Sequence, residues 1–491
     1  MSKITTQNYK SEARKAIKDP VLQSALSGVQ GRLGRGTARA YRELPEGPGL
    51  RRTAHELRMQ AVENLDIILE TLADNIEKNG GRVIFADDDR AAVAACIDIA
   101  RRHDVKTAVK GKSMVTEEIG LNPALEAAGI EVTETDLGEY IIQLAGESPS
   151  HIIAPAIHKT RAQVGRLFAE KLGVPYTDDP PTLTRIARKA LRRKFLAADM
   201  GISGCNLACA ETGHITTVSN EGNIRMATTL PRVHVAFMGM ERVTAHLEDH
   251  DILFRLLSRG AAAQNLAGYI SYIGGPRQAG QTDGPEAFYL IIIDNGRSKI
   301  LADPEFREIL CCIRCAACLN VCPVYGKIGG HAYGYAYSGP VGAVVTPLLV
   351  GIERAKDLFL GETLCGACKE ACPVDIDLPR MLLALRARLA EGPRDRHAGG
   401  GITAEKAFYR VWSAAIRHRR AYAGAMRAAG MAQRAVTRSD GMIHRLPSPL
   451  DAWTRSRNLK PLALASFMDR WKESVKQNQR PNRGKNPETL R

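Results

Sequence analysis

The sequence has 491 residues, more than one ordinary domain needs, so we expect two or three separate cores. Hydrophobic residues make up 44% of the chain and charged residues 25%, a composition that excludes a chain disordered throughout. The net charge of +15 is uneven, because residues 391–491 hold 21 Lys and Arg against 8 Asp and Glu, whereas the rest holds 47 against 45. The basic character therefore belongs to the tail, and without a recognisable nucleic-acid-binding module we expect no nucleic-acid partner.

The amino-terminal part is predicted to be helical. Amphipathic stretches at 9–27 and 53–79 flank the Gly- and Pro-rich segment GRLGRGTARAYRELPEGPG, which we interpret as a linker. The first 20 residues mix charges of both signs and contain no apolar run, so they are no secretory signal. The apolar stretch at 341–352 is too short to cross a bilayer. These features predict a cytoplasmic protein with at most peripheral contact at the inner face of a membrane.

From Gly81 the pattern changes to alternating strands and helices. A strand at 82–86, a helix at 89–103 and a strand at 106–109 begin this block, and a basic helix follows at 182–199. Further strands are predicted at 152–157, 215–218, 233–238, 269–273 and 288–293. Such alternation favours a parallel-rich sheet covered by helices.

The remaining chain is predicted to be helical and then basic. Helical segments with Cys-Pro dipeptides follow residue 301, and an Arg-rich stretch begins near 391. The predicted division is an N-terminal helical extension at 1–65, an α/β domain at 66–300, a helical dicluster domain at 301–390 and a basic C-terminal segment at 391–491.

Two cysteine motifs carry the strongest chemical signal. Eleven cysteines without an export signal argue against a disulfide framework, because cytosolic thiols that cluster usually bind metal or do redox work. The first motif, CIRCAACLNVCP, contains Cys312, Cys315, Cys318 and Cys322 and ends in a proline, as in bacterial ferredoxins. The second motif, CGACKEACP, contains Cys365, Cys368 and Cys372. The pair predicts two iron-sulfur clusters of the four-iron type.

The spacing also predicts how the thiolates are shared. In two-cluster ferredoxins the last cysteine of each motif binds the other cluster. Cluster one is then held by Cys312, Cys315, Cys318 and Cys372, and cluster two by Cys322, Cys365 and Cys368. The second site is one thiolate short.

Several arrangements would complete the second site. It could be a three-iron cluster, a labile cluster, or a four-iron cluster whose fourth ligand is Glu362, Cys311 or an external group; Glu362 stands where a full motif has its first cysteine. Paired C-x-x-C motifs also build zinc sites, but the proline after both motifs and the number of thiolates favour iron.

Two further groups of residues are candidates for other roles. Lys110, Lys112, Ser113 and Thr116 follow a predicted strand, where ligands of α/β sheets tend to bind, and could hold a small anion such as a carboxylate or form a solvated basic loop. Cys205 and Cys209 could be ligands, but small buried thiols are common in cores.

Taken together, these segments resemble the lactate utilization protein B family, the iron-sulfur subunit of a bacterial L-lactate oxidation complex. The resemblance covers nearly the whole chain. It rests on the two cysteine motifs and on KGKSMVTEEIGLN, HKTRAQVGRLFAEKLG, GISGCNLACAETGHITTVSNEGN, GGPRQAGQTDGPEAFYLIIIDNGR and WTRSRNLKPLALASFMDRW. The sequence departs from the family at Cys205 and Cys209, where small apolar residues are expected.

The resemblance implies an α/β domain similar to sugar isomerases and coenzyme A transferases, followed by a helical dicluster ferredoxin domain. It also implies seven ligand cysteines and an electron-transfer role, non-catalytic or co-catalytic, in oxidising L-lactate to pyruvate for growth on lactate. The implied partners are a cysteine-rich subunit and a second lactate-utilization-type subunit, with an electron acceptor such as quinone. In the alternative, the α/β domain is itself a 2-hydroxy-acid dehydrogenase and the clusters are its electron sink. No catalytic residue is assigned.

Overall fold

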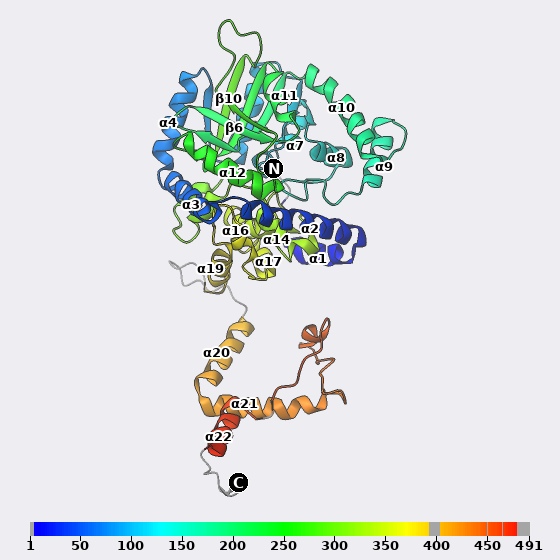
Figure 1. Cartoon of the computed structure of the whole chain (residues 1–491), viewed down its shortest axis with the longest axis vertical. Coiled ribbons are helices and arrows are strands. Elements are labelled where there is room, and N and C mark those ends of the chain that lie inside the picture. Colours follow the sequence, from blue (N-terminus) through cyan, green and yellow to red (C-terminus); the bar gives the residue numbers. More distant parts are fainter. Residues whose placement is uncertain (1–3, 392–402, 449, 464, 479–491) are drawn as a thin grey trace, which may run out of the picture. The chain divides into compact units, whose positions relative to one another are not determined.

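The computed structural model describes residues 4–391, 403–448, 450–463 and 465–478. The chain divides into two units, residues 1–397 and 398–491. In Figure 1 the first unit has an α/β part, which contains β6 and β10, above a helical layer with α14 and α16.

The helices of the first unit are η1 (Thr6–Asn8), α1 (Tyr9–Lys18), α2 (Pro20–Arg42), α3 (Gly47–Glu63), α4 (Leu65–Lys78), α5 (Asp89–Arg102), α6 (Met114–Glu118), α7 (Leu121–Ala127), α8 (Leu137–Ala145), α9 (Arg161–Leu172), α10 (Pro180–Ala197), α11 (Asn223–Thr229), α12 (Glu248–Ala262), α13 (Arg297–Leu301), η2 (Arg307–Cys311), α14 (Ala317–Val321), α15 (Tyr325–Ile328), η3 (His331–Tyr333), α16 (Gly339–Val350), α17 (Lys356–Gly361), α18 (Ala367–Glu370) and α19 (Leu378–Glu391). Its strands are β1 (Arg82–Ala86), β2 (Thr107–Lys110), β3 (Glu131–Glu134), β4 (Met200–Gly204), β5 (Leu207–Cys209), β6 (His214–Ser219), β7 (Val233–Gly239), β8 (Val243–Thr244), β9 (Tyr269–Ile273) and β10 (Ala287–Ile293).

Two sheets form the α/β part. Within the described residues, one sheet has the strand order β1-β10-β7-β4-β2-β3, and all of its neighbours are parallel. The smaller sheet has the order β8-β5-β6-β9 and mixes parallel and antiparallel pairs. The central strands β7 and β10 are nearly all apolar, as expected for strands that are covered on both faces.

Alternate residues of the central strands point to opposite cores. Ile291 and Ile293 of β10 pack into a core with Cys96 of α5, whereas Leu290 and Ile292 pack into a second core with Leu72 of α4. This alternation follows from the two-residue period of a strand. Helices therefore cover both faces of the parallel sheet, which is the predicted parallel-rich α/β architecture.

A third core unites the amino-terminal helices with the helical cysteine-rich segment. It contains Leu26 of α2, Leu50 of α3, Phe254 of α12, Leu319 of α14 and Leu382 of α19. The predicted order of an α/β domain followed by a helical dicluster domain is confirmed. The four-part division of the chain stays a prediction.

Two predictions about local structure were wrong. The apolar run 152–157 forms turns instead of a strand, because the His151 ring accepts hydrogen bonds from the backbone N–H groups of Ile153 and Ala154, both at 3.0 Å. Helix α2 covers residues 31–42 of the Gly-rich segment that we interpreted as a linker, and only residues 43–46 connect it to α3. Asp19 caps the amino-terminal end of α2, because the carboxylate accepts hydrogen bonds from the backbone N–H groups of Val21 and Leu22.

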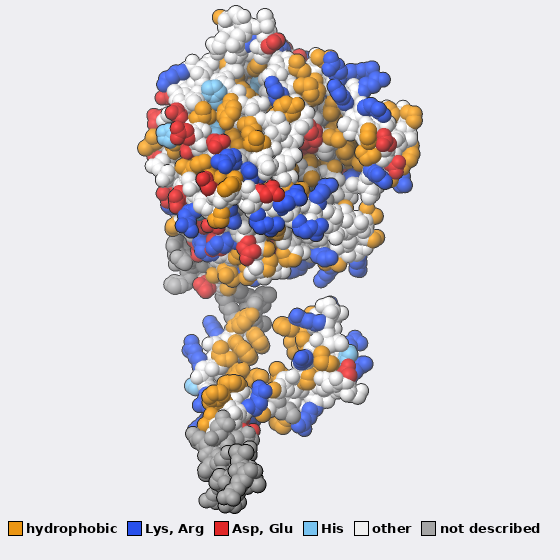
Figure 2. Space-filling view, in the orientation of Figure 1, with side chains coloured by type: hydrophobic (Ala, Val, Ile, Leu, Met, Phe, Trp, Pro, Cys, Tyr) orange, Lys and Arg blue, Asp and Glu red, His pale blue; other side chains and the backbone are white. Residues whose placement is uncertain are grey.

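The second unit is helical and basic. Its helices are α20 (Thr403–Arg417), α21 (Arg419–Ala432), η4 (Gln433–Ala435), η5 (Leu450–Thr454) and α22 (Phe467–Asn478). Figure 2 shows hydrophobic side chains on the surface of this unit, and Val411, Trp412 and Phe467 are among the exposed ones. No helix in the described part of the chain is both long enough and apolar enough to span a membrane.

Candidate functional site

The first motif coils around a small cavity. It begins where η2 ends and continues into α14, and Arg314 and Ala316 between its cysteines have positive φ angles of 57° and 63°. These left-handed residues turn the chain sharply, which lets closely spaced cysteines point inward. Backbone N–H groups donate to the thiol sulfurs of Cys312 and Cys315 at 3.4 and 3.5 Å.

Four thiols from the two motifs share this cavity. Cys312, Cys315 and Cys318 line it together with Cys372, which lies more than fifty positions further along the chain. Apart from Arg314, the other residues that line it are apolar, and Cys315, Cys318 and Cys372 are buried. This is the set of residues that the crossed pattern predicts for cluster one.

Burial and mutual repulsion raise the pKa of three of these thiols, Cys315, Cys318 and Cys372, and favour their neutral form unless a cation is bound. Burial raises the pKa of Cys315 to about 12, and the pKa of Cys318 is raised well above its usual value by burial and by the neighbouring thiols Cys315 and Cys312. These thiols can ionise together only when a metal balances their charge. Soft sulfur donors of this kind, with N–H groups directed at the sulfurs, fit an iron-sulfur cluster.

A second group of thiols lies next to the first. It contains Cys322 and Cys368, which are buried, and Cys365, which is exposed. Cys368 contributes to the raised pKa of Cys318, so the two groups are close. The backbone N–H of Tyr325 donates to the sulfur of Cys322 at 3.4 Å. The exposed Cys365 gives this group an opening to the surface of the unit.

Glu362 adds a carboxylate to the second group. Its side chain is buried, and its Oε2 accepts from the thiol of Cys322 at 3.5 Å. Burial raises the pKa of this carboxyl group. Cys311, the other candidate within the chain, lies elsewhere: its sulfur contacts Met59 Sδ at 3.2 Å.

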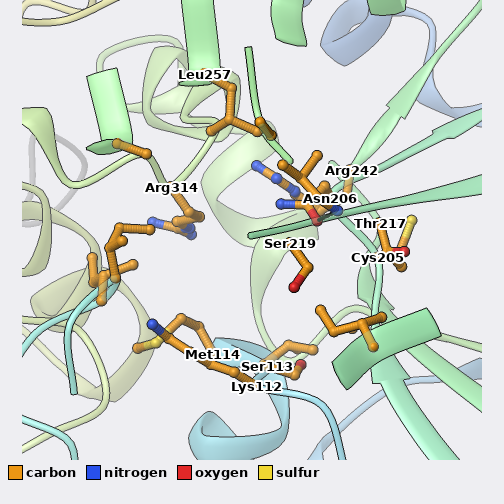
Figure 3. Close-up of a pocket in the computed structure, with 18 of the residues that line it drawn as sticks. Lys112, Ser113, Met114, Cys205, Asn206, Thr217, Ser219, Arg242, Leu257 and Arg314 are labelled. Carbon is orange, nitrogen blue, oxygen red and sulfur yellow. Dashed lines mark hydrogen bonds between the residues drawn. The ribbon is translucent and has the colours of Figure 1, made fainter. Parts of the chain in front are cut away.

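A separate pocket of about 290 Å³ lies at the carboxyl ends of β2, β4 and β7. Lys112 and Ser113 follow β2, Asn206 follows β4, Arg242 follows β7, and Arg314 comes from the first cysteine motif. Figure 3 shows the side chains of Lys112, Arg314, Arg242 and Ser219 arranged around one open space. The pocket therefore joins the ligand-binding edge of the parallel sheet to the cluster-binding segment.

Arginines give the pocket a positive side. Arg242 donates to the carbonyl oxygens of Cys312 and Ile313 at 2.8 and 3.3 Å, and burial together with Arg58 lowers its pKa to about 10. Arg314 lies 4.5 Å over the ring of Tyr337, and its buried Nη1 has no hydrogen-bond partner among the described residues. An anion bound here would find donors that are already desolvated.

Glu241 partly balances this charge. Its Oε1 lies 3.6 Å from Arg314 Nη2, and its Oε2 accepts from Arg297 Nε at 2.8 Å. Arg297 in turn binds Glu118 through two contacts, of 2.9 and 2.7 Å, and Glu118 accepts from the hydroxyl of Tyr337 at 2.5 Å. This buried network connects the α/β part to the cysteine-rich segment.

The candidate anion-binding residues separate into two pairs. Lys112 and Ser113 line the pocket, but Lys110 and Thr116 do not. Lys110 is buried, with its Nζ 2.8 Å from Glu134 and 3.2 Å from Thr116 Oγ1. Burial lowers the pKa of Lys110, but Glu134 and Glu117 outweigh that effect and raise it.

Sequence reasoning missed Arg242 and Arg314 as pocket residues. Arg242 follows a predicted strand, so the strand-end rule could have found it, and Arg314 lies within the first motif. Cys205 lines the pocket, and burial raises its pKa to about 12; Cys209 is buried in the core.

Comparison with known proteins gives independent support. The LUD domain family matches residues 69–293, and the 4Fe-4S dicluster domain family matches residues 308–376. The fold and the grouped thiols thus define an iron-sulfur protein built on a LUD domain. Lactate utilization protein B of Bacillus licheniformis is 43% identical over 476 residues, which cover 97% of this chain and 98% of that protein. The chain belongs to the lactate utilization protein B family.

Other relatives agree. Lactate utilization protein B of Bacillus velezensis is 43% identical over 97% of this chain and 98% of its own length, and that of Bacillus thuringiensis is 43% identical over 96% and 98%. A solved structure of a DUF162 family protein from Deinococcus radiodurans covers 47% of this chain and 98% of its own at 14% identity, and its TM-score of 0.27 is too low to carry an argument.

Proposed function

We propose that this chain is the iron-sulfur electron-transfer subunit of a cytoplasmic complex that oxidises L-lactate to pyruvate and allows growth on lactate. The observation that carries the proposal is the convergence of Cys312, Cys315, Cys318 and Cys372 on one cavity, next to a second thiol group. The names of the relatives link the family to lactate utilization. A role in electron transfer is what such clusters supply when bound.

The proposed ligands divide as the crossed pattern predicts. Cys312, Cys315, Cys318 and Cys372 would hold the first cluster, and Cys322, Cys365 and Cys368 the second. Helix α14 carries Cys318, and Cys322 follows its end, so one short helix connects the two sites. Three of the four thiols at the first site are buried, whereas the exposed Cys365 leaves the second site accessible to a partner. Electrons would therefore pass between the sites within the chain and exchange with a partner near Cys365.

The proposed partners are a cysteine-rich subunit and a second lactate-utilization-type subunit, with quinone or a soluble acceptor taking the electrons. The test is anaerobic reconstitution of the three subunits with L-lactate and an artificial acceptor. Acceptor reduction should require this chain and should be lost in Cys318→Ser and Cys372→Ser. Undiminished lactate oxidation with either variant, in preparations shown to lack the first cluster, would refute an electron-transfer role for that cluster.

The pocket favours a second candidate function, in which the α/β domain binds and oxidises a 2-hydroxy acid. In that case Lys112 and Ser113 would bind the carboxylate beside Arg314, the residue between two cysteines of the first motif. Among the described residues Lys112 forms no ion pair within 4 Å; burial lowers its pKa, and the carboxylates of Asp136 and Glu139 act on it from further away.

Titration calorimetry of the isolated full-length chain with L-lactate and pyruvate tests this candidate. Lys112→Met should weaken carboxylate binding about tenfold or more, because a charge-assisted hydrogen bond is lost. Lys171→Met, at an exposed lysine paired with Glu170, is the matched control and should leave binding unchanged. Lactate should also bleach the visible absorbance of the isolated chain. Absence of both binding and bleaching would exclude this function.

A further inference from the structure

Glu362 lies three residues before Cys365, and Cys365 lies three residues before Cys368. The first motif has the same spacing, with Cys312 in the place that corresponds to Glu362. We infer that the Glu362 carboxylate is the fourth protein ligand of the second cluster, through Oε2. This inference rests on the proposed second cluster at Cys322, Cys365 and Cys368.

The two oxygens of Glu362 have different partners. Oε1 accepts from the hydroxyl of Tyr333 at 3.0 Å, whereas Oε2 faces the sulfur of Cys322 at 3.5 Å. The backbone is also held, because Arg386 Nη2 donates to the carbonyl oxygen of Glu362 at 2.7 Å. Tyr333 and Arg386 therefore position the residue and leave one carboxylate oxygen directed at the thiol group.

No described cation pairs directly with the carboxylate of Glu362, and Arg386 acts on it only from a distance. The residue is only 7% exposed. Within the described part of the chain it has no ion pair with Lys, Arg or His within 4 Å, and Arg386 donates to backbone oxygens instead. A buried carboxylate without a cation is costly. An iron ion at the corner of the cluster would supply that charge.

The alternative donors are placed less well. Cys311 contacts Met59 and is among the neighbours of Arg58 and Cys312, on the side of the first motif. The hydroxyl of Tyr333 already donates to Glu362. The charges that act on Cys368 come from Glu362 first and then from Cys365. These contacts place the carboxylate, rather than Cys311, within the second thiol group.

Oxygen ligation has a chemical consequence that can be measured. A carboxylate is a harder ligand than a thiolate and holds iron in a sulfur-rich cluster less firmly. The fourth iron of the second cluster should therefore be lost more readily on mild oxidation than the irons of the first cluster. Replacement of the carboxylate by a thiolate should suppress that loss.

The experiment compares the wild-type chain with Glu362→Gln and Glu362→Cys, all full-length and purified without oxygen. Iron content, electron paramagnetic resonance and Mössbauer spectra are recorded before and after addition of ferricyanide. The wild type should contain about eight irons, as two four-iron clusters require. Glu362→Gln should lose about one iron and show the signal of an oxidised three-iron cluster. Glu362→Cys should keep its iron and resist ferricyanide.

The control is Glu370→Gln, which removes an exposed carboxylate within the second motif, between Cys368 and Cys372, and should behave as the wild type. Circular dichroism of each variant shows whether it folds. If Glu362→Gln does not fold, the comparison of Glu362→Cys with the wild type after addition of ferricyanide still tests the inference. A full iron content and unchanged spectra in folded Glu362→Gln would overturn the inference, as would a wild type with a three-iron second cluster. In both of those results the two-cluster proposal survives. A wild type that carries zinc or a single cluster would instead refute the proposed function.

Discussion

Replacing Arg297 by methionine would remove the guanidinium that Glu118 and Glu241 share. The side chains of Arg297, Glu118 and Glu241 are 3%, 0% and 2% exposed, so neither carboxylate can turn to solvent. Removal of one partner from a buried ion pair costs about 3–5 kcal/mol, because a charge is left buried without compensation. We expect Arg297→Met to destabilise the first unit by that amount.

The expected change in melting temperature follows from the size of this unit. At about 2.1 cal/mol/K per residue, the roughly 390 residues of the unit give an unfolding entropy of about 0.8 kcal/mol/K. A loss of about 3–5 kcal/mol then lowers the melting temperature by about 4–6 °C. The assay is thermal unfolding followed by near-ultraviolet circular dichroism, under anaerobic conditions at pH 7.5.

The effect should also depend on pH. Burial alone would raise the pKa of Glu118 and of Glu241, but Arg297 acts with other partners, Tyr337 and Asn295 at Glu118 and Arg314 and Arg242 at Glu241, to hold both pKa values below the usual range. In Arg297→Met burial is less opposed at both groups, and the pKa of Glu118, which loses its charged partner, should rise above that of the unfolded chain. A group of that kind destabilises the fold most above its folded pKa and less as the pH falls. The difference from wild type should therefore shrink between pH 7.5 and pH 5.

The control is Arg277→Met. Arg277 pairs with Glu286 at 2.9 Å, but the two side chains are 40% and 57% exposed. Such a pair contributes about 0–1 kcal/mol, so this variant should melt within about 1 °C of the wild type. Equal melting temperatures for Arg297→Met and Arg277→Met would refute the reasoning, as would a deficit in Arg297→Met that grows on acidification.

Two further predictions concern the α/β part. A Cβ at Gly201 would lie 1.7 Å from the carbonyl oxygen of Ala227, so Gly201→Ala should lower the free energy of unfolding by about 1–3 kcal/mol. The control is Gly28→Ala, at a position of helix α2 with open space around it, which should be neutral or stabilising. Equal melting curves for the two variants would contradict this prediction. Burial lowers the pKa of His234 to about 3, so the neutral ring favours the fold above pH 6.5 and this stability is lost as the pH falls. His234→Gln should therefore reduce the slope of unfolding free energy between pH 6.5 and pH 5 by about 1.4 kcal/mol per unit, and an unchanged slope in denaturant titrations would contradict it.

The strands that sequence reasoning found are those with a clear local signal. The apolar runs of β7 and β10 were predicted because strands buried on both faces lack polar residues. The run at 152–157 is also apolar, yet it forms turns, because it contains Pro155, which cannot donate to a sheet, and because a single ring nitrogen of His151 binds two consecutive N–H groups. Such side-chain hydrogen bonds compete with strand pairing and leave no periodic signal.

The length of α2 depends on contacts with distant parts of the chain. A Cβ at Gly34 would lie 3.0 Å from the carbonyl oxygen of Asn320, and a Cβ at Gly36 would lie 2.7 Å from the Cβ of Ala263. These glycines allow close packing between helices, whereas local propensity treats glycine as a helix breaker. Sequence reasoning therefore predicted a linker where tertiary packing forms a helix.

The cysteine groups were predictable because their spacing is itself the chemical signal. The role of Lys110 was not, because it depends on the register of β2 against β3, which pairs Lys110 with Glu134 and directs its charge into an ion pair. β3 has no strong local pattern and was not predicted. The pocket likewise combines Arg242 from one strand end with Arg314 from the cysteine motif, a meeting that only the folded chain brings about.

The central claim is that the two thiol groups hold two iron-sulfur clusters that carry electrons. The most direct test is iron and acid-labile sulfide analysis of the anaerobically purified full-length chain, with electron paramagnetic resonance before and after dithionite. We predict about eight irons and eight sulfides per chain, and spin-coupled signals on reduction that indicate two neighbouring clusters. Stoichiometric zinc without sulfide, or iron for a single cluster in the intact chain, would contradict the claim.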